Sequence, residues 1–197
     1  MSDVKSNAKS DVEHFVDIGI ALSTEKNHHA LLEKILKSAM ELSGADAGTI
    51  YSITDNQKLA FDTVLNTSLN IHLGGTSGNT IDYPNIDILT YGEVNNSAMV
   101  AIAAASGEII NVEDAYQCKN YDLSSAKVMD ERTGYKTVSV LTLPMTNHQG
   151  ELNGIIQLIN STNKDGKPIA FKSEIVRVIQ SLTSFAAIIL TNKFYAL

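Results

Sequence analysis

The chain has 197 residues, of which 44% are hydrophobic and 19% charged, a composition that is ordinary for one globular domain and excludes wholesale disorder. The formal net charge is -7, from 22 acidic and 15 basic residues, and this disfavours nucleic-acid binding because such a surface needs Lys and Arg to replace phosphate counterions. The polar N-terminus lacks the pattern of a secretory signal, and the longest apolar runs stop short of the roughly 20 residues that span a bilayer, so we expect a cytoplasmic protein without membrane insertion.

The N-terminal part of the chain predicts two helices followed by a hairpin. After a polar lead over residues 1–11, apolar residues at helical spacing predict a first helix; they are Val12, Phe15, Val16, Gly19 and Leu22. A second apolar stripe runs from Leu31 to Met40 and ends at Ser43-Gly44, a typical helix stop. Residues 47–53 and 59–64 then predict two strands joined by a turn over 54–57.

The middle of the chain is less regular. The Gly-rich segment 73–78 (LGGTSG) predicts a flexible turn, and Pro84 marks another irregular stretch. The small apolar residues 98–105 predict a short buried helix that ends at Gly107, followed by a strand over 109–112. Residues 114–132 show no sustained period, and we expect a long loop that carries a short helix, as lids and binding loops do.

The C-terminal part predicts a second hairpin and a long helix. Strands are expected over 138–144 and 152–160, with Gly150 supplying the positive φ that the turn between them needs. Another turn follows over 163–168, and the last helix runs from about 172 to 195. Its stripe suits either a coiled-coil-like partner or the domain's own sheet. Together these elements predict an α+β fold with an antiparallel sheet.

Metal, cysteine and nucleophile chemistry is not indicated. Cys118 is the only cysteine, so an intrachain disulfide and a multi-cysteine zinc site are excluded. His28 and His29 are neighbours that point about 100° apart on a helix and make a poor ligand pair. The Gly-rich segment lacks the Lys of a phosphate-binding loop, and no nucleophile elbow is present. We therefore expect no catalytic residue and no metal site.

Three sequence blocks carry a family resemblance. They are residues 31–53 (LLEKILKSAMELSGADAGTIYSI), 104–116 (AASGEIINVEDAY) and 129–160 (MDERTGYKTVSVLTLPMTNHQGELNGIIQLIN). These blocks resemble a GAF domain of the kind found in cyclic-nucleotide phosphodiesterases and adenylate cyclases. Residues 66–78 (NTSLNIHLGGTSG) are similar to bacterial GAF domains that precede HD-GYP phosphohydrolases. The resemblance covers about residues 12–192, with 172–195 as a C-terminal signalling helix.

The resemblance implies a non-catalytic sensory module. It implies a central antiparallel sheet with helices packed on one face and a ligand pocket on the other, under mobile loops. It also implies a homodimer formed through the N- and C-terminal helices, which signals to an output domain or to a separate signalling protein such as a phosphodiesterase or cyclase. A cyclic nucleotide is the leading ligand, and no other cofactor is implied.

The same resemblance implies a set of ligand-binding residues. The block DERTGYKT points to Asp130, Thr133 and Thr137, the short apolar helix offers the N–H groups of Met99 and Val100, and Thr49 and Gln157 match inward-facing polar positions. Each has a plainer alternative: Thr133 as a loop cap, Thr137 as an ordinary strand residue, and Gln157 as a satisfied core polar group.

Two family motifs are incomplete in this chain. Of the NKFDE signature, Asn160 and Phe171 remain, whereas Ser161 follows the Asn and Ile175 stands where the Asp belongs. The Cys-His pair that attaches a bilin in phytochromes is absent, because Cys118 precedes Lys119.

Two alternatives to ligand sensing stay open on the sequence. One is a ligand-free dimerisation module whose pocket is filled by Phe or Met side chains, whereas an open cavity lined by Thr49, Thr133, Thr137 and Gln157 favours binding. The other is methionine-sulfoxide reduction, which some GAF-fold enzymes perform with several cysteines, and the single cysteine disfavours it.

Overall fold

The computed structural model describes residues 16–192. The predicted polar lead, Val12 and Phe15 of the first apolar stripe, and the predicted helix end at 193–195 lie outside the described residues. Within them a helix covers 16–24, followed by α2 (His28–Ser43), β1 (Ala45–Ile53), β2 (Lys58–Asn66), β3 (Ile71–Gly74), β4 (Ile86–Asp87), β5 (Leu89–Thr90), β6 (Glu93–Val94), α3 (Met99–Ser106), β7 (Ile110–Val112), α4 (Ser124–Thr133), β8 (Val140–Thr146), β9 (Leu152–Thr162), β10 (Pro168–Ile169) and α5 (Ser173–Leu190).

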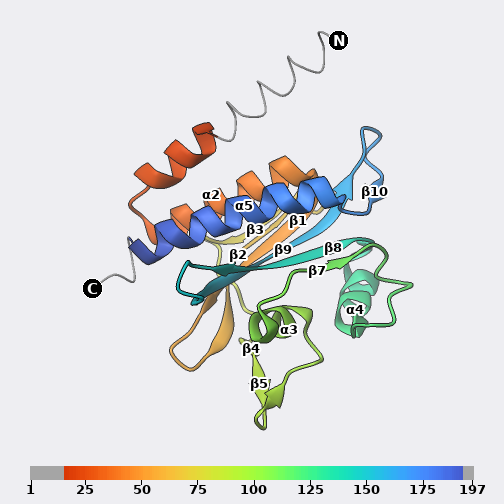
Figure 1. Cartoon of the computed structure of the whole chain (residues 1–197). Coiled ribbons are helices and arrows are strands. Elements are labelled where there is room, and N and C mark those ends of the chain that lie inside the picture. Colours follow the sequence, from red (N-terminus) through yellow and green to blue (C-terminus); the bar gives the residue numbers. More distant parts are fainter. Residues whose placement is uncertain (1–15, 193–197) are drawn as a thin grey trace.

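One antiparallel sheet forms the centre of the molecule (Figure 1). Its strand order is β3-β2-β1-β9-β8-β7, with β4 pairing β2 and β10 pairing β9. The predicted hairpins are confirmed as β1–β2 and β8–β9, and β1 joins them by pairing with β9. Strand β8 begins at Val140, later than the predicted start at residue 138. This architecture confirms the predicted α+β class.

Helices α2 and α5 cover one face of the sheet (Figure 1). Helix α2 begins after Asn27, whose side chain accepts a hydrogen bond from the Ala30 N–H at 3.0 Å, and it ends at Gly44 with φ +64°. The predicted stripe of α2 packs on the apolar inner face of β1, β8 and β9, where Leu36, Ile50 and Leu143 are fully buried. Burial of each such side chain stabilises the fold by roughly 1.5–3 kcal/mol.

Helix α5 divides its predicted apolar stripe between two faces. Ile179, Leu182 and Ala186 are buried in the core formed with α2 and the sheet. Val178 and Phe185 are each 37% exposed, and they lie on the side of the helix that faces away from the core. The Phe185 ring also lies close to Gly19 of the helical segment 16–24. The stripe therefore serves the domain's own core and leaves a second, half-exposed apolar edge.

Helix α5 is also, among residues 16–192, the helix that is long and apolar enough to cross a membrane by length and composition. Polar residues such as Gln180 and Thr183 divide this helix into short apolar runs, and for that reason the length of uninterrupted runs did not single it out. Its buried face packs against α2 and the sheet.

Helices α3 and α4 lie on the opposite face of the sheet (Figure 1). Helix α3 confirms the predicted short buried helix and ends at Gly107, with φ +72°. Helix α4 is the helix expected within the long loop, but it extends to Thr133 and ends at Gly134. A second apolar cluster, which includes Val100 and Ile155, packs between α3 and the sheet.

The Gly-rich segment 73–78 is an anchored turn, where a flexible one was expected. Gly74 and Gly75 have φ of +67° and +55°, and a Cβ at these positions would collide with the Asp62 carbonyl oxygen and the Glu33 carboxylate respectively. Glu33 on α2 accepts hydrogen bonds from the Thr76 N–H at 2.6 Å and the Thr76 hydroxyl at 2.8 Å. Gly74 thus allows the end of β3 to pass close to the β2 backbone, and Gly75 allows the chain to approach Glu33 on α2.

Candidate ligand-binding site

A cavity of about 660 Å³ lies between the sheet and the layer formed by α3, α4 and the segment that carries β4. This volume falls within the range of about 300–1,000 Å³ that is usual for small-molecule sites. All of the residues predicted to bind a ligand line it: Thr49, Met99, Val100, Asp130, Thr133, Thr137 and Gln157. The fold therefore brings the predicted set together, and their part in binding stays a prediction.

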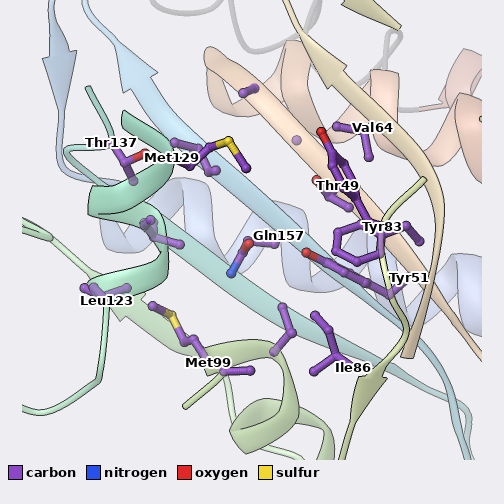
Figure 2. A pocket seen from close by; sticks show the side chains of 18 of the residues that line it. Thr49, Tyr51, Val64, Tyr83, Ile86, Met99, Leu123, Met129, Thr137 and Gln157 are labelled. Carbon is purple, nitrogen blue, oxygen red and sulfur yellow. The ribbon is translucent and has the colours of Figure 1, made fainter. Parts of the chain in front are cut away.

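A polar row crosses three strands at the floor of the cavity, which Thr49 and Gln157 line, whereas Thr142 is fully buried beside Gln157. Gln157 on β9 pairs in register with Thr49 on β1 and with Thr142 on β8. The Gln157 Nε2 donates to Thr142 Oγ1 at 3.1 Å, and Thr142 Oγ1 donates to Met99 Sδ at 3.5 Å. Figure 2 shows the Gln157 side chain projecting into the space bounded by Thr49, Met99 and Leu123. Sequence reasoning missed Thr142, although a Thr between two Leu of a strand marks an inward polar position.

The N-terminal end of α3 meets the cavity through Met99 and Val100. The preceding residue, Ala98, provides no side-chain cap, and the first intrahelical bonds run from Ala101 and Ile102 to its carbonyl oxygen. The N–H groups of Met99 and Val100 precede this ladder and belong to the helix end that carries partial positive charge. The helix itself does not use these two amides, and their use by a ligand stays a prediction.

Asp130 clamps α4 to the segment that leads into β8. Its carboxylate is 6% exposed and accepts hydrogen bonds from the Thr137 N–H at 2.7 Å, the Thr137 hydroxyl at 2.8 Å and the Tyr116 hydroxyl at 2.8 Å. The hydrogen bond to Asp130 and burial raise the pKa of Tyr116. Asp130 and Thr137 thus satisfy each other, and both support the cavity wall in addition to lining it.

Thr133 has the capping role that was the plainer alternative. Its hydroxyl donates to the Met129 carbonyl oxygen at 2.9 Å and accepts from the Tyr135 N–H at 3.2 Å. These bonds close the last turn of α4 at Gly134, whose φ is +70°. A ligand acceptor at this hydroxyl would compete with the cap for its single proton.

An aromatic wall stands beside the polar floor. Tyr51, Phe61 and Tyr83 line the cavity, with ring centroids 4.8 Å apart for the first pair and 5.2 Å for the second. Burial raises the pKa of Tyr51, against the opposing effect of the Thr49 hydroxyl. Sequence reasoning missed this wall because β1, β2 and the irregular segment near Pro84 contribute one ring each, and no local period links them.

The charges around the cavity are acidic. Among the described residues that line it, none is Lys, Arg or His, whereas Asp87, Asp122 and Asp130 are present. Asp87 pairs with Lys58 at 2.7 Å, and Asp130 is held by its three donors. A ligand anion would therefore find its favourable contact at the end of α3.

Asn160, which remains from the NKFDE signature, joins β9 to the segment that follows α4. Its Oδ1 accepts from the N–H groups of Val138 and Ser139 at 2.7 and 3.2 Å, and its Nδ2 donates to the Lys136 carbonyl oxygen at 2.8 Å and the Tyr135 hydroxyl at 3.0 Å. The conformation at Asn160 is left-handed, with φ +57°. Asn tolerates this conformation better than most residues. The motif's Asn therefore has a structural role without the Lys–Asp pair.

Within residues 16–192, no three His, Cys, Asp or Glu side chains gather in a way that could hold a metal ion. The single cysteine, Cys118, is half-buried and packs against the second apolar cluster. The polar features of the cavity are thus hydroxyls, amides and carboxylates.

Comparisons with known proteins agree with the fold. The sequence model of the GAF domain family matches residues 27–190. A dual 3′,5′-cyclic-AMP and -GMP phosphodiesterase 11A from Takifugu rubripes is 27% identical over 185 residues, covering 91% of this chain and 18% of that protein. A cGMP-specific 3′,5′-cyclic phosphodiesterase from Drosophila melanogaster is 27% identical over 157 residues, covering 77% and 13% respectively.

A solved structure is similar over almost the whole chain. The GAF domain of a phosphoenolpyruvate-protein phosphotransferase from Coxiella burnetii superimposes with a TM-score of 0.67 at 17% identity, covering 97% of this chain and 99% of that domain. This similarity shows the fold alone. The chain spans less than a fifth of the length of the two phosphodiesterases.

Proposed function

This chain belongs to the GAF domain family, whose domains are sensory and regulatory, and on that premise we propose that it is a non-catalytic sensor that binds a small ligand in the cavity beneath α3 and α4. The observation that carries the proposal is the open cavity of about 660 Å³ with a polar floor. A 3′,5′-cyclic nucleotide is the leading ligand, because the similar phosphodiesterases act on cyclic AMP and cyclic GMP.

The cavity offers a suitable contact for each part of a cyclic nucleotide. The N–H groups of Met99 and Val100 suit the single negative charge of the cyclic phosphate. The aromatic wall suits the flat face of a purine, since ring pairs prefer offset or edge-to-face contacts. Thr49 and Gln157 supply hydrogen-bonding groups at the floor. Asp130, Thr133 and Thr137 then hold the wall that α4 forms over the ligand.

The signal leaves the domain through α5. This helix packs on β8 and β9, the strands that carry Thr142 and Gln157. Near its end, the Thr191 hydroxyl accepts hydrogen bonds from Asn147 Nδ2 and Asn153 Nδ2, each at 3.1 Å, which tie the helix to the β8–β9 hairpin. A ligand that shifts the floor would therefore move both strands and the helix end together.

We assign the dimer contact to the apolar residues left exposed on α5 and the helical segment 16–24. They are Val16, Ile20, Val178, Phe185 and Ile188, which are 37–56% exposed. In a cytoplasmic homodimer this surface would align two copies of α5, which lead toward an output domain or a separate phosphodiesterase, cyclase or HD-GYP phosphohydrolase. Burial of these side chains would supply the association free energy.

The same exposed surface favours a second candidate function, a ligand-free dimerisation module. On this hypothesis the cavity would be plugged by Phe or Met side chains. Phe61, Met99 and Met129 do line the cavity, but they leave its volume open, which supports ligand binding as the first choice.

Isothermal titration of the purified protein with cyclic AMP, cyclic GMP and cyclic di-GMP tests the proposal. We expect saturable binding of at least one nucleotide, lost in Ala126→Phe, because Ala126 on α4 lines the cavity and a phenyl ring there would occupy the ligand's volume. The matched control is Glu131→Phe, which places the same ring at an exposed position of the same helix. Flat titrations with all three nucleotides would refute nucleotide binding and move the dimerisation module to first place.

A further inference from the structure

The amide of Gln157 is half-satisfied, and its free half faces the cavity. Nε2 donates to Thr142 Oγ1, whereas Oε1 accepts no hydrogen bond from any residue between 16 and 192. Oε1 is also absent from the buried polar atoms that lack a partner in the described structure, so it is open to the cavity. An acceptor with two lone pairs is therefore presented at the centre of the floor.

Thr142 and Met99 set the direction of this amide. The Thr142 side chain is fully buried, and its hydroxyl has a single proton to donate. The Oγ1–Sδ distance of 3.5 Å directs that proton toward the thioether of Met99. The hydroxyl oxygen is then left as an acceptor, and only the NH₂ side of Gln157 can satisfy it. The carbonyl side consequently points to the ligand.

The aromatic wall beside the floor constrains the ligand independently. Phe61 contacts both Tyr51 and Tyr83, and all three rings border the cavity. A flat ring is the group that such a wall accommodates with most contact and little loss of conformational freedom. The floor and the wall together call for a flat ring that has a donor on its edge.

We infer that Gln157 determines ligand specificity by accepting a hydrogen bond from an N–H group on a planar heteroaromatic ring. In this arrangement Thr142, held by Met99, is the positioning residue that turns the Gln157 carbonyl toward the ligand. This inference rests on the proposed function and adds to it the hydrogen-bond donor that the ligand must carry on the edge of its ring. Rings without an N–H donor leave Oε1 buried and unpaired, and they bind more weakly for that reason.

Cyclic nucleotides that differ only at the base edge test the inference. Cyclic AMP carries an amino group, cyclic IMP and cyclic GMP carry a ring N–H, and the cyclic monophosphate of unsubstituted purine riboside carries neither. In isothermal titrations of the wild-type protein we expect the best of the first three to bind about tenfold or more tightly than the unsubstituted compound. In Gln157→Met this advantage should fall to within about twofold, since the acceptor is gone.

The positioning role of Thr142 has a readout of its own. Thr142→Val removes the acceptor for Nε2, which allows the amide to turn and offer its NH₂ group to the ring nitrogens of unsubstituted purine. The advantage of the N–H donors should then fall to about threefold or less. Thr142→Ser keeps the hydroxyl and should keep the full advantage, so it controls for a general change in packing.

The outcomes separate this inference from the proposed function. Binding of the nucleotides with no preference for an N–H donor would overturn the role of Gln157 and leave the cyclic-nucleotide sensor standing. An advantage that survives Thr142→Val would overturn the positioning role. Flat wild-type titrations with all four compounds would refute cyclic-nucleotide binding itself, and the inference with it.

Discussion

Replacing Asp130 with Ala should release α4 from the sheet while leaving the core intact. The carboxylate holds three donors, and the substitution would leave the N–H of Thr137, a residue only 5% exposed, without its acceptor. Hydrogen bonds to a charged group contribute about 1.5–3 kcal/mol each, and they are not additive within one cluster. We therefore expect the free energy of local opening at α4 to fall by about 2–4 kcal/mol.

Hydrogen exchange measured by mass spectrometry distinguishes this local effect from global unfolding. A loss of that size lowers the protection of peptides over residues 124–139 by about 30-fold or more. Peptides from α5 should keep their protection, because its buried face belongs to the core on the other side of the sheet. The control is Glu131→Ala, an exposed neighbour on the same helix. Equal exchange in the two variants would refute the assignment of Asp130 as a clamp.

Three further predictions concern the anchored turn and the dimer contact. Burial opposes ionisation of Glu33, but hydrogen bonds from Lys37 and Thr76 prevail and lower its pKa from 4.5 to about 2. The ionised carboxylate therefore stabilises the fold above pH 4.5, and this stabilisation is lost as the pH falls toward 2. In urea titrations, the free energy of unfolding of the wild type should fall by about 2 to 3 kcal/mol more than that of Glu33→Gln between pH 6 and pH 2.5. Parallel curves for the two proteins would contradict this. Gly74→Ala should lower the free energy of unfolding by at least about 2 kcal/mol more than Gly78→Ala. Both glycines have positive φ, but only at Gly74 would the new Cβ collide with backbone atoms. Equal thermal midpoints of the two variants would argue against an anchored turn. Phe185→Glu should convert a dimer into monomers in sedimentation velocity, and an unchanged sedimentation coefficient would exclude this dimer contact.

The sequence alone predicted the elements whose causes are local. Helix α2 follows from an apolar stripe at helical spacing and a Gly that accepts φ +64° at its end. The β1–β2 and β8–β9 hairpins follow from apolar segments on either side of turn residues. Strands as short as β4, β5 and β6, of two residues each, contain no full period, and they were missed for that reason.

Seven of the residues lining the cavity could be predicted through the family resemblance, but the aromatic wall and most of the individual roles could not. Asp130 lies in the expected block, yet the structure pairs it with Thr137 and Tyr116, whereas Thr133 takes the capping role that the sequence offered only as the plainer alternative. These roles depend on where α4 ends and how its last turn sits against β8. Neither feature has a signature within a short window of sequence.

The features of the cavity that select a ligand depend on tertiary structure. Thr49, Thr142 and Gln157 form one row only because β9 pairs with β1 and β8 in a particular register, and a shift of one residue would turn Gln157 to the opposite face. The aromatic wall likewise needs three separate segments to converge. Local spacing therefore determined the helices and hairpins of this protein, whereas strand register and helix packing, which join residues distant in sequence, decided what its cavity can recognise.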